Sequence, residues 1–153
     1  MDKTFGSKVN ELNTEQPRTL LSAIQLSSRA DVSKNLNTIT KQLTSITQKN
    51  LNEQHIIVLP ECCIYFGGKD SEQLSLAQQS STNDQLSVQL AALAKKFKVF
   101  LVAGSIPILT SEGDKFTNSC CVFSPTGHKI SQYDKIHLFD VEVSIVTNLG
   151  FSC

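Results

Sequence analysis

The amino-acid sequence predicts an α/β fold, in which a sheet that begins with parallel strands is covered by helices. Two observations carry this prediction. Short apolar runs are typical of strands, and longer stretches with an apolar residue every three or four positions are typical of helices. The two kinds of segment also alternate along the chain. A length of 153 residues fits one domain, and 40% hydrophobic against 18% charged residues is a globular composition.

The first strand is predicted at residues 20–26 and the first helix at residues 32–48. Residues 1–17 before them are polar and are interpreted as a flexible leader. Asp31 is a typical N-cap residue. After it, apolar side chains recur at spacings of four and three, which places them on one stripe of a helix: Val32, Leu36, Ile39, Leu43 and Ile46.

The second strand is predicted at Ile56–Leu59, a continuous apolar run of the kind that is buried on both faces. It should end at Pro60, which has no N–H for a ladder hydrogen bond. Residues 67–82 are rich in Gly, Ser and Gln and are interpreted as a surface loop with at most a short helix. Asn83 or Asp84 then caps a second helix, whose buried face is Leu86, Leu90, Leu93, Ala94 and Phe97.

A third strand and a hairpin complete the predicted sheet. The third strand is Val99–Ala103, and Gly104-Ser105 after it is interpreted as a turn. Phe116–Phe123 and Lys129–Tyr133 form the hairpin. The Ser-Pro-Thr-Gly sequence at 124–127 between them is typical of a type I turn.

Charge and composition exclude several classes of function. Fourteen Lys and Arg against fourteen Asp and Glu exclude a strongly basic nucleic-acid binder and a polybasic lipid binder. No apolar run reaches the roughly 20 residues of a spanning helix, and no secretory-type apolar segment stands near Met1. We therefore expect a cytoplasmic protein without nucleic-acid or membrane partners.

The pairs Cys62-Cys63 and Cys120-Cys121 are interpreted as core thiols, since their spacing does not suit a metal.

Glu61 and Lys135 are the residues to which the local pattern assigns chemistry. Glu61 directly follows a buried strand, where sites of open α/β sheets gather. We expect a poorly solvated carboxylate there, suited to act as a general base. The alternative is a glutamate that turns outward and caps a turn. Lys135 follows the hairpin and could stabilise an oxyanion. The alternative is a solvated lysine that pairs with Asp134 or Asp140.

Several of these segments, taken in order, resemble the N-terminal half of the nitrilase superfamily of carbon–nitrogen hydrolases. The resemblance covers about residues 19–143, and it is strongest to the branch of omega-amidases and deaminated-glutathione amidases. It rests on Ala23–Leu26, Asn35-Leu36, Ile57–Glu61, Val102–Ser105, Phe116–Ser119, Ser124–Gly127 and Tyr133–Asp140.

This resemblance implies a nitrilase-type αββα sandwich, truncated after roughly its first half. The partial hydrolase domain would span 18–143, and 144–153 would be an aberrant or truncated tail. The family's Glu-Lys-Cys triad hydrolyses a non-peptide C–N bond without metal or cofactor. A small amide is the favoured candidate substrate, and a nitrile is the less favoured one. By motif, Glu61 would be the general base, and Lys135 would stabilise the tetrahedral intermediate.

The family's nucleophilic cysteine has no clear counterpart. It stands well downstream of the lysine, whereas only 18 residues (153 − 135) follow Lys135 here. Cys153 is either a displaced nucleophile or a product of truncation. We therefore expect weak or no activity from the chain alone. One alternative is a non-catalytic fragment that associates with full-length relatives, or a homo-oligomer. Another is a small doubly wound ligand-binding domain.

Overall fold

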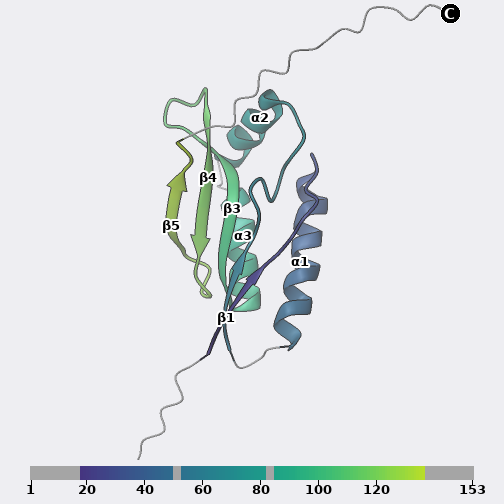
Figure 1. Ribbon diagram of the computed structural model, residues 1–153. Helices are drawn as coiled ribbons and strands as arrows, with labels where there is room; N and C mark the ends of the chain where they lie inside the picture. Colours follow the sequence, from purple (N-terminus) through teal and green to yellow (C-terminus); the bar gives the residue numbers. More distant parts are fainter. Residues whose placement is uncertain (1–17, 50–52, 82–84, 137–153) are drawn as a thin grey trace, which may run out of the picture.

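The computed structural model describes residues 18–49, 53–81 and 85–136, which form one five-stranded sheet and three helices (Figure 1). The α/β prediction is confirmed. The leader at 1–17 and the tail at 144–153 lie outside the described residues, as does the end of the predicted domain after 136. The strands are β1 (Thr19–Ala23), β2 (Gln54–Val58), β3 (Phe100–Leu109), β4 (Phe116–Phe123) and β5 (Lys129–Asp134), and the helices are α1 (Val32–Lys49), α2 (Asp70–Ser81) and α3 (Gln85–Phe97).

The strands lie side by side in the order in which they occur in the sequence. The pairs β1–β2 and β2–β3 are parallel, and the pairs β3–β4 and β4–β5 are antiparallel. The parallel pairs are joined by helices, as their geometry requires, and β4 and β5 form the predicted hairpin. The carboxyl ends of β1 and β2 therefore lie at the same edge of the sheet.

Helix α1 begins where its N-cap residue predicts. The Lys34 backbone N–H donates to Asp31 Oδ1 over 3.0 Å, which satisfies one of the free donors of the first turn. Ile39 and Leu43 of the predicted stripe are fully buried. The helix thus packs through the face that the spacing of its apolar residues indicates.

Strand β3 is longer than predicted, because Gly104-Ser105 forms a β-bulge and not a turn. Ala103 pairs with Cys121 and Ile106 with Ser119, so two residues of β3 face one residue of β4. The strand continues beyond the bulge to Leu109. β1 is shorter than predicted, although the Ile24 N–H still donates to the Val58 carbonyl over 2.9 Å.

The prediction of a loop at 67–82 is wrong, since α2 has 12 residues. The residues that α2 buries most deeply are Ala77 and Ser80. A buried face made of such small side chains leaves no stripe of large apolar residues in the sequence. The helix is identified by its packing, with Leu76 against the core.

The two faces of the sheet differ in their cover. One face packs against the helices and carries the fully buried strand residues, such as Ile57, Leu101 and Phe123. The opposite face presents an apolar row across four strands, because alternate strand residues point to opposite faces. The described helices pack on the first face, where the buried cluster lies. In register, this row is Ala23, Val58, Val102 and Val122. Leu21, on the same face, is 72% exposed.

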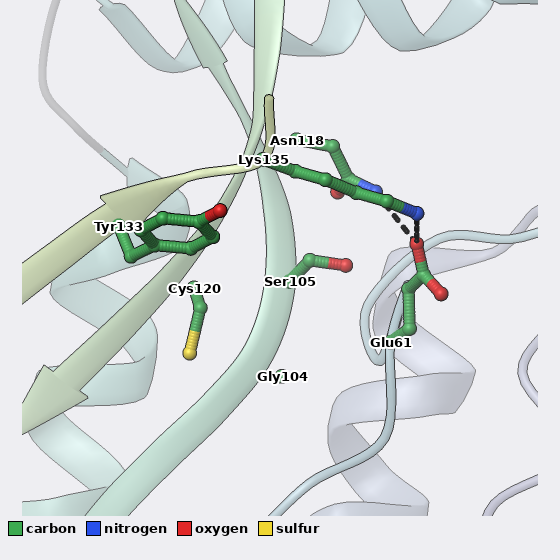
Figure 2. A pocket seen from close by; sticks show the side chains of 7 residues that line it. All are labelled: Glu61, Gly104, Ser105, Asn118, Cys120, Tyr133 and Lys135. Carbon is green, nitrogen blue, oxygen red and sulfur yellow. Dashed lines mark hydrogen bonds and ion pairs between the residues drawn. The ribbon is translucent and has the colours of Figure 1, made fainter. Parts of the chain in front are cut away.

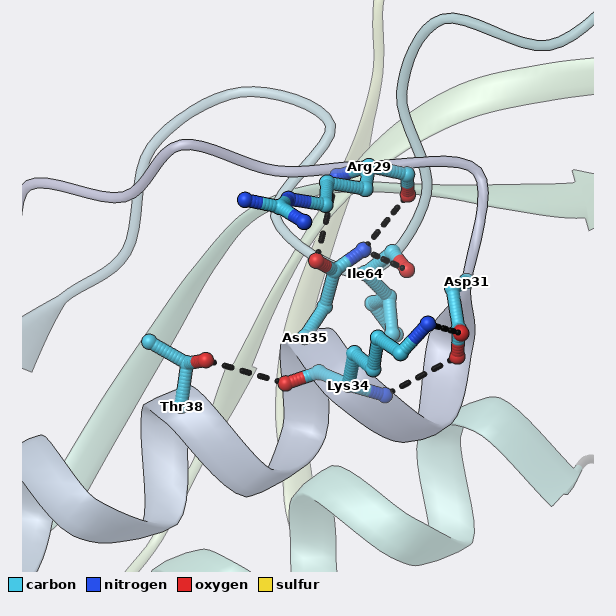
Figure 3. A network of polar contacts seen from close by, with 6 residues as sticks. All are labelled: Arg29, Asp31, Lys34, Asn35, Thr38 and Ile64. Carbon is cyan, nitrogen blue, oxygen red and sulfur yellow. Dashed lines mark hydrogen bonds and ion pairs between the residues drawn. The ribbon is translucent and has the colours of Figure 1, made fainter.

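The turn that follows β2 is tied to the start of α1 by a buried asparagine (Figure 3). Asn35 is 5% exposed, and its Nδ2 donates to the carbonyl of Ile64 and to that of Arg29, each over 2.7 Å. Its Oδ1 accepts the Arg29 N–H over 3.1 Å. One amide therefore holds together two loops at the carboxyl edge of the sheet.

Candidate active site

The structure brings together Glu61 and Lys135, which are 74 residues apart in the sequence (Figure 2). Lys135 Nζ lies 2.6 Å from Glu61 Oε1. Glu61 follows the end of β2, and Lys135 follows the end of β5. The alternative partners of Lys135 were acids next to it in sequence. Its ion pair in the described part of the chain is with Glu61, and Asp140 lies outside that part.

The expected poor solvation of Glu61 is wrong for the described residues. The Glu61 side chain is 57% exposed, and that of Lys135 is 33% exposed. The reason is that the described residues cover only the helical face of the sheet. An exposed ion pair contributes little to stability, typically about 0.2–1 kcal/mol. The significance of this pair therefore lies in its chemistry.

The backbone after Glu61 has an unusual conformation that a buried serine supports. Cys62 has a φ of 51°, in the left-handed region that few residues other than glycine adopt. Its N–H donates to Ser105 Oγ over 2.8 Å. Ser105 is 4% exposed and belongs to the bulge of β3. The bulge thus holds the turn that presents Glu61.

Asn118 of β4 contacts both candidate residues. Its Nδ2 donates to Glu61 Oε1 over 3.2 Å, and its carbonyl oxygen accepts the Lys135 N–H over 3.0 Å. The same Nδ2 lies 3.9 Å from Cys62 Sγ. Two donors, an amide and an ammonium, therefore converge on one oxygen of the Glu61 carboxylate.

The end of β5 is fixed by a second polar contact with β4. Ser119, which is fully buried, donates from Oγ to Asp134 Oδ1 over 2.7 Å. Gln132 Nε2 donates to the same oxygen over 2.9 Å. The hydrogen bond from Ser119, followed by that from Gln132, lowers the pKa of the Asp134 carboxyl below its usual value. These contacts hold the strand from which Lys135 extends.

The pair borders an open pocket of about 210 Å³ on the uncovered face of the sheet. A pocket of this size is slightly below the usual range for a small-molecule site. Both polar and apolar groups line it. They are Glu61, Gly104, Ser105, Asn118, Cys120, Tyr133 and Lys135.

The four described cysteines are free thiols, and they divide into two kinds. Cys63 and Cys121 are fully buried, as core thiols were expected to be. Cys62 and Cys120 are only half-buried, and Cys120 lines the pocket. The interpretation as core residues is therefore right for one member of each pair, because neighbours on extended chain point to opposite sides.

Burial raises the pKa of the Cys63 thiol to about 12 from a usual 9.0. A raised folded-state pKa means that the stabilisation is complete below the unfolded value and is lost as pH rises through the folded value. We expect the free energy of unfolding to fall between pH 9 and about 12 more in the wild type than in Cys63→Ala. Urea denaturation of both proteins across this window measures the difference. Parallel curves for the two proteins would contradict the expectation.

In the described part of the chain, no group of three or more His, Cys, Asp or Glu side chains is placed to hold a metal ion. Among those same residues, no helix has the length and apolar character needed to span a membrane.

Sequence reasoning missed three residues of this site, which are Asn118, Cys120 and Tyr133. Each is an ordinary strand residue by type. Asn118 and Tyr133 stood within the segments of the family resemblance, but no local pattern distinguished them. Strand register was the missing information, because Cys120 pairs with Tyr133 and Asn118 with Pro107.

Comparison with known proteins identifies relatives of this chain. The carbon-nitrogen hydrolase family matches residues 20–151. The omega-amidase NIT3 of Saccharomyces cerevisiae is 35% identical over 96 residues, which are 62% of this chain and 33% of the relative. The omega-amidase NIT2-B of Xenopus laevis is 32% identical over 80% of this chain and 42% of its own length. A deaminated glutathione amidase of Synechocystis is 30% identical over 81% of this chain and 44% of its own.

Solved structures show the same fold. The crystal structure of S. cerevisiae Nit3, described as a member of the nitrilase superfamily, matches with a TM-score of 0.62 and 28% identity. The match covers 74% of this chain and 42% of that one. The NitFhit protein of C. elegans matches with a TM-score of 0.68 and 23% identity over 80% of this chain and 29% of that one.

This chain spans between a third and a half of the length of the curated relatives above. The family match covers most of its residues and includes both Glu61 and Lys135. The chain therefore belongs to the carbon–nitrogen hydrolase family, in the amidase branch of the nitrilase superfamily.

Proposed function

We propose that this chain provides the base and the cation of a site that hydrolyses the C–N bond of a small amide, with a nitrile as the less favoured candidate substrate. The observation that carries the proposal is the contact of Glu61 and Lys135 at the edge of a pocket. Relatives named omega-amidase and deaminated glutathione amidase support an amide as substrate. The free thiols of Cys62, Cys63 and Cys120 support a reducing compartment such as the cytoplasm.

The proposed mechanism assigns one task to each group. The Glu61 carboxylate takes the proton of a cysteine thiol, whose sulfur then attacks the amide carbon. The Lys135 ammonium stabilises the negative oxygen of the tetrahedral intermediate. Collapse of this intermediate releases ammonia, which takes its proton from Glu61, and leaves a thioester. Water, deprotonated by Glu61, then hydrolyses the thioester. No described cysteine is assigned the role of nucleophile.

Ammonia release from a 2-oxo-acid amide by the 153-residue chain tests this proposal. We expect slow release, lowered about 10²–10⁴-fold in Glu61→Gln because a general base is lost. Lys135→Met is expected to lower it about 10²–10³-fold, as loss of oxyanion stabilisation does. Exposed residues elsewhere supply the matched controls, Glu112→Gln and Lys41→Met, which should retain the wild-type rate. Release that survives Glu61→Gln would contradict the mechanism.

A second candidate function is non-catalytic association with another polypeptide, such as a full-length relative or a second copy. The uncovered apolar row, with Leu21 72% exposed and Tyr133 59% exposed, favours this role. Exposed apolar surface of this extent is typical of interaction sites. The same assay separates the two functions, because a binding partner without chemistry releases no ammonia at any protein concentration.

A further inference from the structure

Asn118 is the residue that connects the two candidate catalytic groups through two different kinds of contact. Its side chain donates to Glu61 Oε1, and its backbone carbonyl accepts the N–H of Lys135. We infer that Asn118 is a positioning residue, which sets the placement of the base relative to the cation. The catalytic role in this inference rests on the proposed function. The contacts of Asn118 with Glu61 and Lys135 do not depend on that function.

The contacts of Asn118 also distinguish the two oxygens of the Glu61 carboxylate. Asn118 Nδ2 and Lys135 Nζ both contact Oε1, at 3.2 Å and 2.6 Å. Oε2 has no hydrogen-bond partner among the residues that the structure describes. A carboxylate held by one oxygen keeps the other available for proton transfer. Asn118 thus selects which oxygen of Glu61 serves as the base.

The placement of Asn118 in the fold suits a positioning role. It lies on β4, which pairs with β3 on one side and β5 on the other. Its own register partner is Pro107, and the neighbouring Ser119 is bonded to Asp134 of β5. The side chain therefore extends from a strand that is braced on both sides. A 57% exposed glutamate lacks comparable support of its own.

An amide is the suitable group for this contact. It donates a hydrogen bond without adding charge, so the Lys135 ammonium remains the cation of the pair. A carboxylate at the same position would place a like charge beside Glu61. An aliphatic side chain would keep the volume and remove the donor. These differences define the variants that test the inference.

The test measures hydrogen exchange of the Lys135 ammonium by ¹⁵N NMR in the full chain, a readout that does not require activity. In Asn118→Leu, the Glu61 carboxylate loses its second donor and is held less firmly against the ammonium. Exchange should therefore be faster, by up to about fivefold, the factor that corresponds to one net hydrogen bond. Asn118→Gln, which retains an amide, should restore much of the protection. Asn37→Leu, an exposed change on α1, is the matched control and should leave exchange unchanged.

Three results would overturn the inference. The first is unchanged exchange in Asn118→Leu. The second is faster exchange that Asn118→Gln fails to restore, since loss of strand packing would then be the cause. If Asn118→Leu does not fold, Asn118→Ala replaces it in the test. The third result is then unchanged exchange of the Lys135 ammonium in Asn118→Ala. Failure of the proposed function is separate, because it would appear as absent ammonia release with the exchange effect intact.

Discussion

Replacing Gly104 by alanine is expected to lower the free energy of unfolding by about 3 kcal/mol or more, at the upper end of overpacking effects. A Cβ at this position would overlap the Leu59 carbonyl oxygen and the Pro60 carbonyl group. Backbone atoms cannot move aside as a flexible side chain can. The turn after β2 would have to shift, and Glu61 is in that turn. Urea denaturation measures the loss of stability.

Gly113→Ala is the matched control for this substitution. Gly113 has a φ of 79° but nothing within 4 Å of the position that a Cβ would take. Its replacement should cost only the strain of a left-handed alanine, about 1–2 kcal/mol. Equal decreases in the free energy of unfolding for the two variants would show that the close approach of β3 to the turn does not affect stability. Faster exchange of the Lys135 ammonium in Gly104→Ala alone would show that the shift reaches the ion pair.

Replacing Asn35 by alanine is expected to destabilise the fold by about 3 kcal/mol, since a buried hydrogen-bonding group is left unsatisfied. The carbonyl of Ile64 would lose its donor in a buried position. Closer to solvent, the Arg29 N–H would lose its acceptor, and the Arg29 carbonyl would keep only the N–H of Phe66 as donor. The loop after β1 and the turn after β2 would then lose the buried part of their connection. Thermal and urea unfolding measure the effect.

Asn37→Ala provides the control, because this asparagine is exposed on the same helix. It should change stability by less than about 0.5 kcal/mol, as surface substitutions usually do. A loss in Asn35→Ala that does not exceed that of Asn37→Ala would contradict the structural role of the buried amide. Asn35→Asp should also be destabilising, since a carboxylate cannot donate to Ile64.

Local patterns predicted the elements whose own side chains form a large apolar face. Helix α1 has such a stripe and a capping Asp31, and β2 is a continuous apolar run that stops before Pro60. Helix α2 was missed because its most deeply buried residues are small, and the bulge at Gly104 was missed because a glycine and a serine also form turns. In both places, tertiary packing decides the conformation.

The candidate site could be predicted only in part, for a similar reason. Glu61 and Lys135 were identified by motif, and their contact is possible because the strand directions place the carboxyl ends of β2 and β5 at the same edge of the sheet. Asn118 gave no signal, because its role depends on which side chain its strand places beside the glutamate. Solvent exposure of Glu61 was also mispredicted, since it depends on what covers the other face of the sheet.

The strand order of the sheet has a consequence for the way the polypeptide assembles during synthesis. Each strand after β1 pairs with the strand before it in the sequence, so among the described strands only β1 waits for a later one to supply its neighbour. The parallel pairs close over the segments that hold α1, α2 and α3, and the antiparallel pairs close over short loops. On the ribosome, this sheet can grow one strand at a time in the direction of translation. The last of the described strands, β5, carries the lysine to its glutamate, so the ion pair forms only after the five described strands have paired.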